Sequence, residues 1–218
     1  MISSVKCTQI LHVKILIVLM SFMSYSAWAH PHSWIDMKTQ VLGNNHTVTG
    51  FNMQWTFDRM TTAYLFDGED MSPSHQKQTL NKIAISVLEK MIKSHYFTNV
   101  TDNGKNISFQ PIDTGKLTTD KGKATLYFII MLKKPYQFNN NKLKIQVFDP
   151  TYYVDITWNS QHEFELTKNL KSHCNVQLIK PHPTLAQINR AMTLPIDENP
   201  DYQLGQIFTQ TVNLTCQS

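Results

Sequence analysis

Short runs of alternating apolar and polar residues, or of β-branched residues, dominate the chain from Ser33 onward. They predict strands over residues 33–42, 46–56, 106–112, 123–133, 142–148, 152–158, 177–180 and 209–215. Turn-forming clusters of Asn, Asp, Gly and Pro separate them, as in Gly43-Asn44-Asn45. Many short strands joined by polar turns predict an antiparallel β-sandwich.

A helical pattern interrupts these strands. Apolar residues recur at helical spacing over residues 80–92, with Ser72 as the expected N-cap and Pro73 at the first helical position. The segment 58–66 is expected to add a short helix, and another is expected after Pro183.

The expected fold is therefore mainly β within the α+β class. It combines an antiparallel β-sandwich with a helical insertion around residues 58–95 and a short C-terminal helix. No repeat, low-complexity tract or flexible linker divides the sequence.

Residues 1–29 have the pattern of a secretory signal peptide. Two lysines precede an apolar run over residues 15–23, and the triplet 27–29 supplies small residues at a cleavage site. The run is shorter than the roughly 20 apolar residues that a spanning helix needs. Cleavage after the triplet predicts a single β-rich periplasmic domain over residues 30–218 with no membrane span, and an uncleaved anchor is the alternative.

Charge and motif content narrow the classes of function. Loss of the two lysines in the signal lowers the formal net charge from +4 to +2, and no Lys/Arg cluster follows. A chain so close to neutral shows no electrostatic footprint for nucleic acid or membrane, so we expect neither as a partner. The sequence also lacks a nucleophile elbow, a phosphate-binding Gly loop and an H-E-x-x-H motif, so we do not expect an enzyme.

Two cysteines, Cys174 and Cys216, remain after Cys7 leaves with the signal. An even count in an oxidising compartment predicts one disulfide. A loop of about 40 residues closed in this way stabilises the fold by roughly 3 to 4 kcal/mol in the chain-entropy model. A metal-binding thiolate pair is the alternative, although C-x-x-C spacing is missing.

The expected mature N-terminus, His30-Pro31-His32, is the first candidate for chemistry. Cleavage exposes an α-amine beside the imidazole of His30, and both are suited to Ni, Co, Zn and Cu. Pro31 has no N–H, which excludes a square-planar copper site built on the second amide. The amine and ring of His30 would instead form a bidentate pair that His32 or a distant side chain completes. The alternative is that these residues are simply a polar N-terminal segment that binds no metal.

Three further residues are candidates for additional metal ligands. Asp58 follows a strand and precedes a helix, so helix capping is favoured over metal binding there. Asp149 precedes Pro150, so a turn that its own carboxylate closes is favoured. His182 lies between two prolines and is a weak auxiliary candidate, and we treat the other histidines of the expected mature domain as background: His46, His75, His95, His162 and His173.

Five features occur in order along the chain: His30-Pro31-His32, Trp55-Thr56-Phe57-Asp58, Tyr96-Phe97-Thr98, Asp149-Pro150-Thr151-Tyr152-Tyr153, and the late cysteines. Together they resemble the domain of unknown function 1007 family. The resemblance implies an exported bacterial protein, associated with a nickel/cobalt-type transporter in the inner membrane. The segment Phe66-Asp67-Gly68-Glu69-Asp70-Met71 is too short for the twelve-residue calcium loop expected of many relatives, so calcium binding is not carried over.

These observations give three functional hypotheses. The first is a periplasmic accessory protein that binds a divalent transition metal through His30 and His32 and exchanges it with an inner-membrane transporter or permease. The second is a β-sandwich interaction module that docks on an envelope transporter without metal. The third is a copper redox protein with a histidine brace, which needs the amine, the ring of His30 and another imidazole around one ion.

Overall fold

The computed structural model describes residues 33–112, 114–139, 141–151, 153–194 and 201–217. The expected signal peptide, His30 and His32 lie outside these ranges. The strands are β1 (Ser33–Asn44), β2 (Thr47–Phe57), β3 (Thr98–Asp102), β4 (Lys105–Asn106), β5 (Gly115–Asp120), β6 (Lys123–Gln137), β7 (Lys142–Val147), β8 (Val154–Thr157), β9 (Phe164–Leu166), β10 (Cys174–Ile179) and β11 (Thr211–Cys216). The helices are α2 (Arg59–Phe66), α3 (Gln76–Met91), α4 (Lys168–Lys171), α5 (Leu185–Met192) and α6 (Tyr202–Phe208), with short 3₁₀ segments η1 (Ile92–Phe97) and η2 (Gln161–Glu163).

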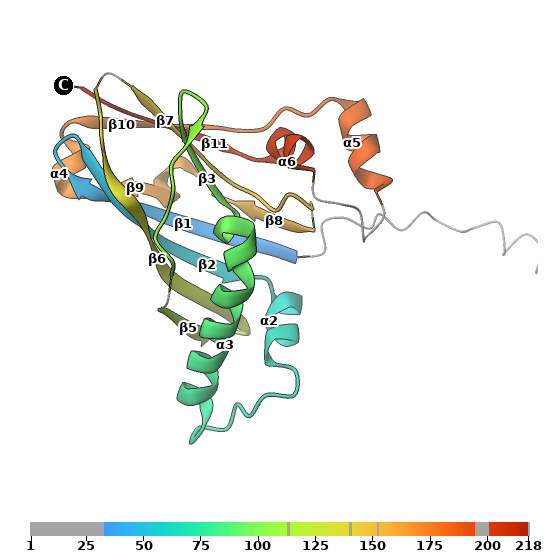
Figure 1. Cartoon of the computed structure of the whole chain (residues 1–218). Coiled ribbons are helices and arrows are strands. Elements are labelled where there is room, and N and C mark those ends of the chain that lie inside the picture. Colours follow the sequence, from blue (N-terminus) through green and yellow to red (C-terminus); the bar gives the residue numbers. More distant parts are fainter. Residues whose placement is uncertain (1–32, 113, 140, 152, 195–200, 218) are drawn as a thin grey trace, which may run out of the picture.

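Two sheets form the body of the fold (Figure 1). One has the strand order β5-β6-β2-β1-β8, with β9 also paired to β1, and the other has the order β10-β11-β7-β3-β4. Alternate residues of β1 and β2, such as Met37 and Met53, are buried, while their neighbours Lys38 and Gln54 lie on the other face. This period of two gives each sheet an apolar face, and the apolar side chains of both sheets belong to one buried cluster. The structure therefore confirms a mainly β fold consistent with a sandwich.

The sequence predicted an antiparallel sandwich, but the structure also contains parallel strand pairs. β1 pairs antiparallel with β2 but parallel with β8 and β9. A parallel pair needs a long crossover between its strands, and residues 45–153 supply it between β1 and β8. The turn pattern revealed where strands end but not which distant strand lies beside which.

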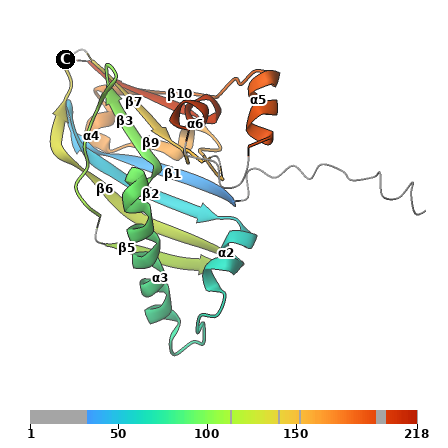
Figure 2. The same cartoon turned by 45° about the vertical axis from the view of Figure 1, so that its right-hand side comes forward.

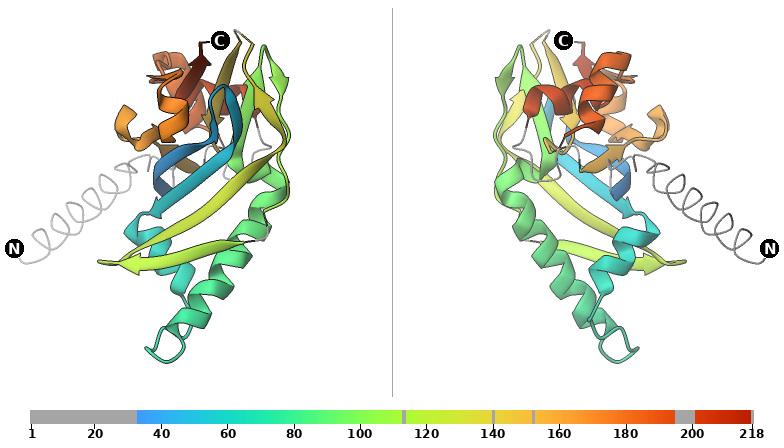
Figure 3. Two further views of the ribbon diagram at one scale, coloured as in Figure 1. Left: turned by 90° about the vertical axis from the view of Figure 1, so that its left-hand side faces the viewer. Right: turned by 90° about the vertical axis from the view of Figure 1, so that its right-hand side faces the viewer.

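The helical insertion confirms the expectation for residues 58–95. In Figure 2, α2 directly follows the end of β2, and the side views in Figure 3 show α3 crossing β5. At Gly115 in β5 an added Cβ would come 2.6 Å from Leu88 Cδ1 of α3, so a glycine permits this close approach. The expected cap at Ser72 is wrong: α3 begins at Gln76, because the carbonyl of Ser72 accepts the N–H groups of His75 and Gln76 and closes a separate turn first.

The C-terminal region contains the expected helix after Pro183 and one that was not expected. Thr184 caps α5 in a capping box with Gln187, and Asp201 caps α6. Within the described ranges, every helix falls short of the length and apolar character needed to cross a bilayer. The predicted disulfide is confirmed, and it joins Cys174 to Cys216 where β10 and β11 lie directly opposite each other.

Candidate functional site

The described chain begins at one end of β1, where Asp58 and Asp155 lie on either side of the strand. Ser33 and Trp34 pair with Val154 and Asp155 of β8 on one side. On the other side, the N–H and carbonyl groups of Trp34 both bond Asp58. We call Ser33, Trp34, Asp58, Val154 and Asp155, with Asp149 that bonds Val154, the first end of β1. Residues 30–32 join the described fold here, so any ligands they carry are covalently tethered to this place.

Asp58 is the N-cap of α2, as the sequence favoured. Its Oδ1 accepts the N–H groups of Met60 and Thr61 at 2.7 and 3.0 Å, and its Oδ2 accepts the N–H of Trp34 and the hydroxyl of Thr61. The hydroxyl of Ser33 lies 2.8 Å from that of Thr61 and donates to it, because the Thr61 proton is directed at Asp58. Burial raises the pKa of Asp58, but the hydrogen bonds from Thr61, Trp34 and Met60 outweigh it and hold that pKa below its usual value. All four acceptor positions of the carboxylate are therefore used.

Asp149 closes a turn that leads into β8, also as the sequence favoured. This buried carboxylate accepts the N–H groups of Thr151, Tyr153 and Val154 at 2.9, 3.2 and 3.1 Å, together with the hydroxyl of Thr151. It therefore positions the strand that pairs with Ser33. Its lone pairs are occupied in the same way as those of Asp58, so both residues act as local anchors in this structure.

Asp155 differs from both, and the sequence analysis did not select it. It lies in β8 opposite Trp34 and is half-buried. Burial raises the pKa of its carboxyl, and no hydrogen bond or ion pair reaches it from the described residues. A signal was present in the sequence: an acidic residue between Val154 and Ile156 breaks a β-branched run without a turn or cap to explain it. Asp155 is thus the carboxylate at this end with free acceptor positions.

The remaining candidates do not join this group. His182 lies exposed between β10 and α5. Within the described ranges, no three His, Cys, Asp or Glu side chains are grouped so that they could hold one metal ion.

The motifs that carry the family resemblance meet in the fold. The Trp55 ring stacks on Phe97 with centroids 6.3 Å apart, and the carbonyl of Phe97 accepts the N–H of Phe148. The hydroxyl of Tyr96 accepts the N–H of Ile112 at 2.9 Å. These contacts are structural. They connect β2, η1 and the Asp149 turn, and so brace the segments that carry the carboxylates.

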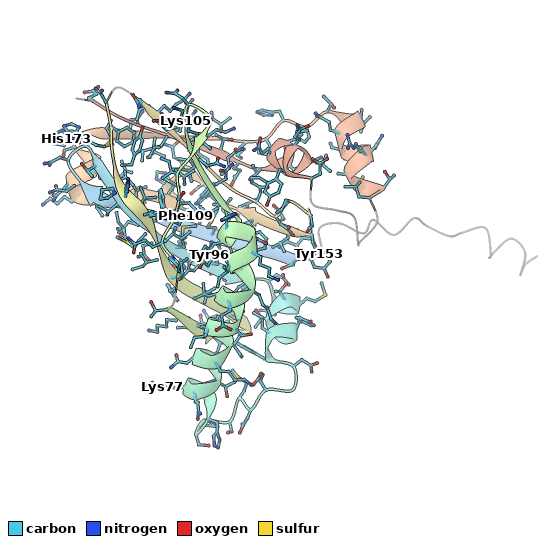
Figure 4. The ribbon with its side chains drawn as sticks, in the orientation of Figure 1. Lys77, Tyr96, Lys105, Phe109, Tyr153 and His173 are labelled. Atoms are coloured by element: carbon cyan, nitrogen blue, oxygen red, sulfur yellow. A yellow bond between two sulfur atoms is a disulfide. The ribbon has the colours of Figure 1, made fainter. Side chains whose placement is uncertain are left out.

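A hollow of about 680 Å³ lies beside the Asp149 turn, between η1, β3 and α6. Three consecutive residues on its rim, His95, Tyr96 and Phe97, have left-handed backbone angles with φ near 50°. Such angles are strained for residues other than glycine. In Figure 4, Tyr96 and Phe109 lie in this central region. Aromatic and amide side chains line the hollow, including Phe109, Phe148, Tyr202, Asn99, Gln110 and Gln206.

Comparison with known proteins identifies a family, but no activity is known for that family. Residues 15–216 match the family model described as "Protein of unknown function (DUF1007)". An "Uncharacterized protein" of Haemophilus influenzae (strain ATCC 51907 / DSM 11121 / KW20 / Rd) is 29% identical over 201 residues, which cover 90% of this chain and 95% of the relative. No solved structure matches the chain.

Proposed function

The chain belongs to the DUF1007 family, and from the chemistry at the first end of β1 we propose that it binds a divalent transition metal in the periplasm. The ligands are the α-amine freed by cleavage after Ala29, the imidazole of His30, and His32. Nickel, cobalt, zinc and copper suit these nitrogen donors. We further propose that the protein passes this ion to, or receives it from, an inner-membrane transporter.

The observation that carries the proposal is the Asp155 carboxylate, which has no partner among the described residues and lies beside the first of them. An acidic group that is half-buried without a partner costs free energy, which a nearby cation offsets. Residues 30–32 carry two imidazoles and would carry the amine, and they lead directly into Ser33, whose strand pairs with that of Asp155. Asp155 thus completes the ligand set or hydrogen-bonds one of its imidazoles.

The confirmed disulfide supports the compartment. Disulfides persist mainly in oxidising compartments such as the bacterial periplasm. The Cys174–Cys216 bridge therefore agrees with export, on which the N-terminal ligands depend.

A metal titration of correctly processed protein tests the proposal. Mass spectrometry of the N-terminal peptide first establishes that the chain starts at His30. We expect one extra residue before His30 to weaken nickel, zinc and copper binding more than tenfold, because it removes the chelating amine. Equal affinities in the two forms would overturn the proposal.

Asp155→Asn, with Asp36→Asn as its matched control, tests the carboxylate. Asp36 lies two residues along β1 from Trp34 and already has partners: Asn159 Nδ2 at 3.2 Å and Lys123 Nζ at 3.6 Å. We expect Asp155→Asn to weaken metal binding by about tenfold, the usual cost of losing an outer-shell partner. We expect Asp36→Asn to leave it unchanged. If both variants matched the parent, Asp155 would have no part in the site.

A docking function is the second candidate, and a group of exposed apolar side chains favours it. Trp34, Met60 and Tyr64 are 45%, 65% and 81% exposed, and they come from β1 and α2 where these meet at the first end of β1. Contiguous exposed apolar patches mark sites of protein contact, whereas single exposed apolar residues are ordinary. Elemental analysis of untagged protein from periplasm distinguishes the two functions, since a docking module without metal would contain far less than one ion per chain.

A further inference from the structure

Two histidines that are far apart in the sequence lie against each other at the opposite end of β1. His46 belongs to the turn between β1 and β2, and His173 directly precedes β10. Their ring centroids are 4.8 Å apart and the ring planes make an angle of 61°. We call His46 and His173, with the adjoining Asn45 and Cys174, the far end of β1. Figure 4 shows His173 and Tyr153 on opposite sides of the molecule.

The backbone on both sides of this pair is fixed. The carbonyl of His46 accepts the N–H of Phe138, and the carbonyl of His173 accepts the N–H of Gln217, each at 2.9 Å. Cys174, next to His173, is bonded to Cys216, and its sulfur lies 3.7 Å from the carbonyl oxygen of Asn45. The backbone of both histidines is therefore held in place before any ligand arrives.

The ring spacing fits two imidazoles that share one ion. An imidazole nitrogen holds zinc at about 2.0–2.1 Å, so two rings on one ion with an N–metal–N angle of about 100° have centroids about 5 Å apart. The observed 4.8 Å matches that arrangement. Edge-to-face packing of aromatic rings gives similar spacing, so the spacing alone does not distinguish a shared metal ion from ring packing.

A ring nitrogen of His46 distinguishes the two. The Nδ1 of His46 is buried and has no hydrogen-bond partner among the described residues. A buried nitrogen left unpaired costs free energy. Neither His46 nor His173 forms an ion pair with a carboxylate in the described ranges. A neutral imidazole with an unused lone pair is a ligand for divalent transition metals.

We infer that His46 and His173 form a second site for a divalent transition metal such as Zn²⁺, Ni²⁺ or Cu²⁺, with water in the remaining coordination positions. No third His, Cys, Asp or Glu joins them in the described part of the chain, so water would complete the coordination of the ion. The inference does not rest on the proposed function. β1 spans Ser33–Asn44, and at about 3.3 Å per residue its two ends are about 36 Å apart.

Zinc titration of the full processed protein, followed by NMR of the imidazole nitrogens, tests the site directly. We expect the ring signals of His46 and His173 to shift together as zinc is added. The same shifts are expected when an extra residue precedes His30, which separates this site from the N-terminal one. If neither ring responded, the rings would only pack against each other and the inference would fail.

Variants give an independent measurement. We expect His46→Gln and His173→Gln each to weaken zinc binding at this site more than about tenfold, since losing a ligand costs at least as much as losing an outer-shell partner. His162→Gln, which removes an exposed histidine of η2, is the matched control and should bind like the parent. Circular dichroism establishes that each variant is folded. Unchanged affinity in a folded His46→Gln or His173→Gln variant would overturn the inference.

Discussion

The two ends of β1 carry different polar side chains and hold them by different means. At the first end, the carboxylates of Asp58 and Asp149 accept N–H groups from residues close to them in sequence. At the far end, His46 and His173 come from distant segments, and a disulfide beside His173 helps to fix them. This difference indicates that a carboxylate at a strand end mainly accepts hydrogen bonds from nearby backbone N–H groups. The better ligand candidates are side chains without such a local use, Asp155 at one end and the histidine pair at the other.

Removal of the disulfide should produce the largest effect and should loosen the far end selectively. The Cys174→Ala, Cys216→Ala double variant opens a loop with a sequence separation of 42, which costs about 4 kcal/mol in the chain-entropy model. Urea unfolding measures the loss. Zinc binding at His46 and His173 should weaken, while binding that depends on the N-terminal amine should not. Equal stability of the variant and the parent would show that the strand pairing alone holds this end.

Asp149→Ala should produce the next largest effect, at the first end. It leaves the N–H groups of Thr151, Tyr153 and Val154 without their charged acceptor, which costs about 3 kcal/mol. Hydrogen exchange should show faster opening of β8 while β10 stays protected. Thr151→Ala keeps the carboxylate and is the control, expected to lose less than about 1 kcal/mol. A similar loss in both variants would mean that the hydroxyl, not the carboxylate, organises the turn.

Asp58→Ala should cost less, about 1 to 2 kcal/mol, the usual cost of losing a helix N-cap. The pKa of Asp58 is lowered in the folded protein, so its contribution is complete above the unfolded value of about 3.9 and is lost as pH falls through the folded value. The difference in unfolding free energy between parent and variant should therefore shrink in acid. A difference that did not change with pH would contradict the role given to the ionised carboxylate.

Asp155→Asn should produce the smallest effect and the opposite sign. The pKa of Asp155 is raised in the folded protein, so its charge destabilises the metal-free fold once pH exceeds the unfolded value of about 3.9. With a chelator present at neutral pH, we expect the variant to be more stable by up to about 0.5 kcal/mol. This gain should disappear in acid. A loss of stability on substitution would show that Asp155 already has a partner in the metal-free protein.

The elements predicted correctly are those set by neighbouring residues, whereas the strand predicted over residues 106–112 is wrong, because only Lys105–Asn106 form a strand there, β4. The alternation in β1, β2 and β6, the Asp58 cap and the Asp149 turn all depend on residues a few positions apart. The missed strands β3, β5 and β9 are short or polar, and their partners in the sheet complete them. The cap of α3 was misplaced because Ser72 closes a turn of its own.

The candidate sites also differ in whether neighbouring or distant residues determine them. His46 and His173 lie 127 positions apart, and neither has a sequence neighbour that marks it as a ligand, so only the fold brings them together. The sequence marks Asp155 only as an acidic residue within a β-branched run, and its burial and lack of a partner among the described residues come from the fold alone. The expectations for His30 and His32 stay predictions, since both lie outside the described ranges.

The parallel pairing of β1 with β8 also fixes an order of assembly. The β1–β2 hairpin can form early, because its strands are adjacent in sequence. Ser33 cannot meet Val154 until the long stretch of chain between them is also in place. The carboxylate of Asp155 therefore joins the start of β1 late in folding, so under the proposed function a metal site that needs it is completed only when the fold itself is.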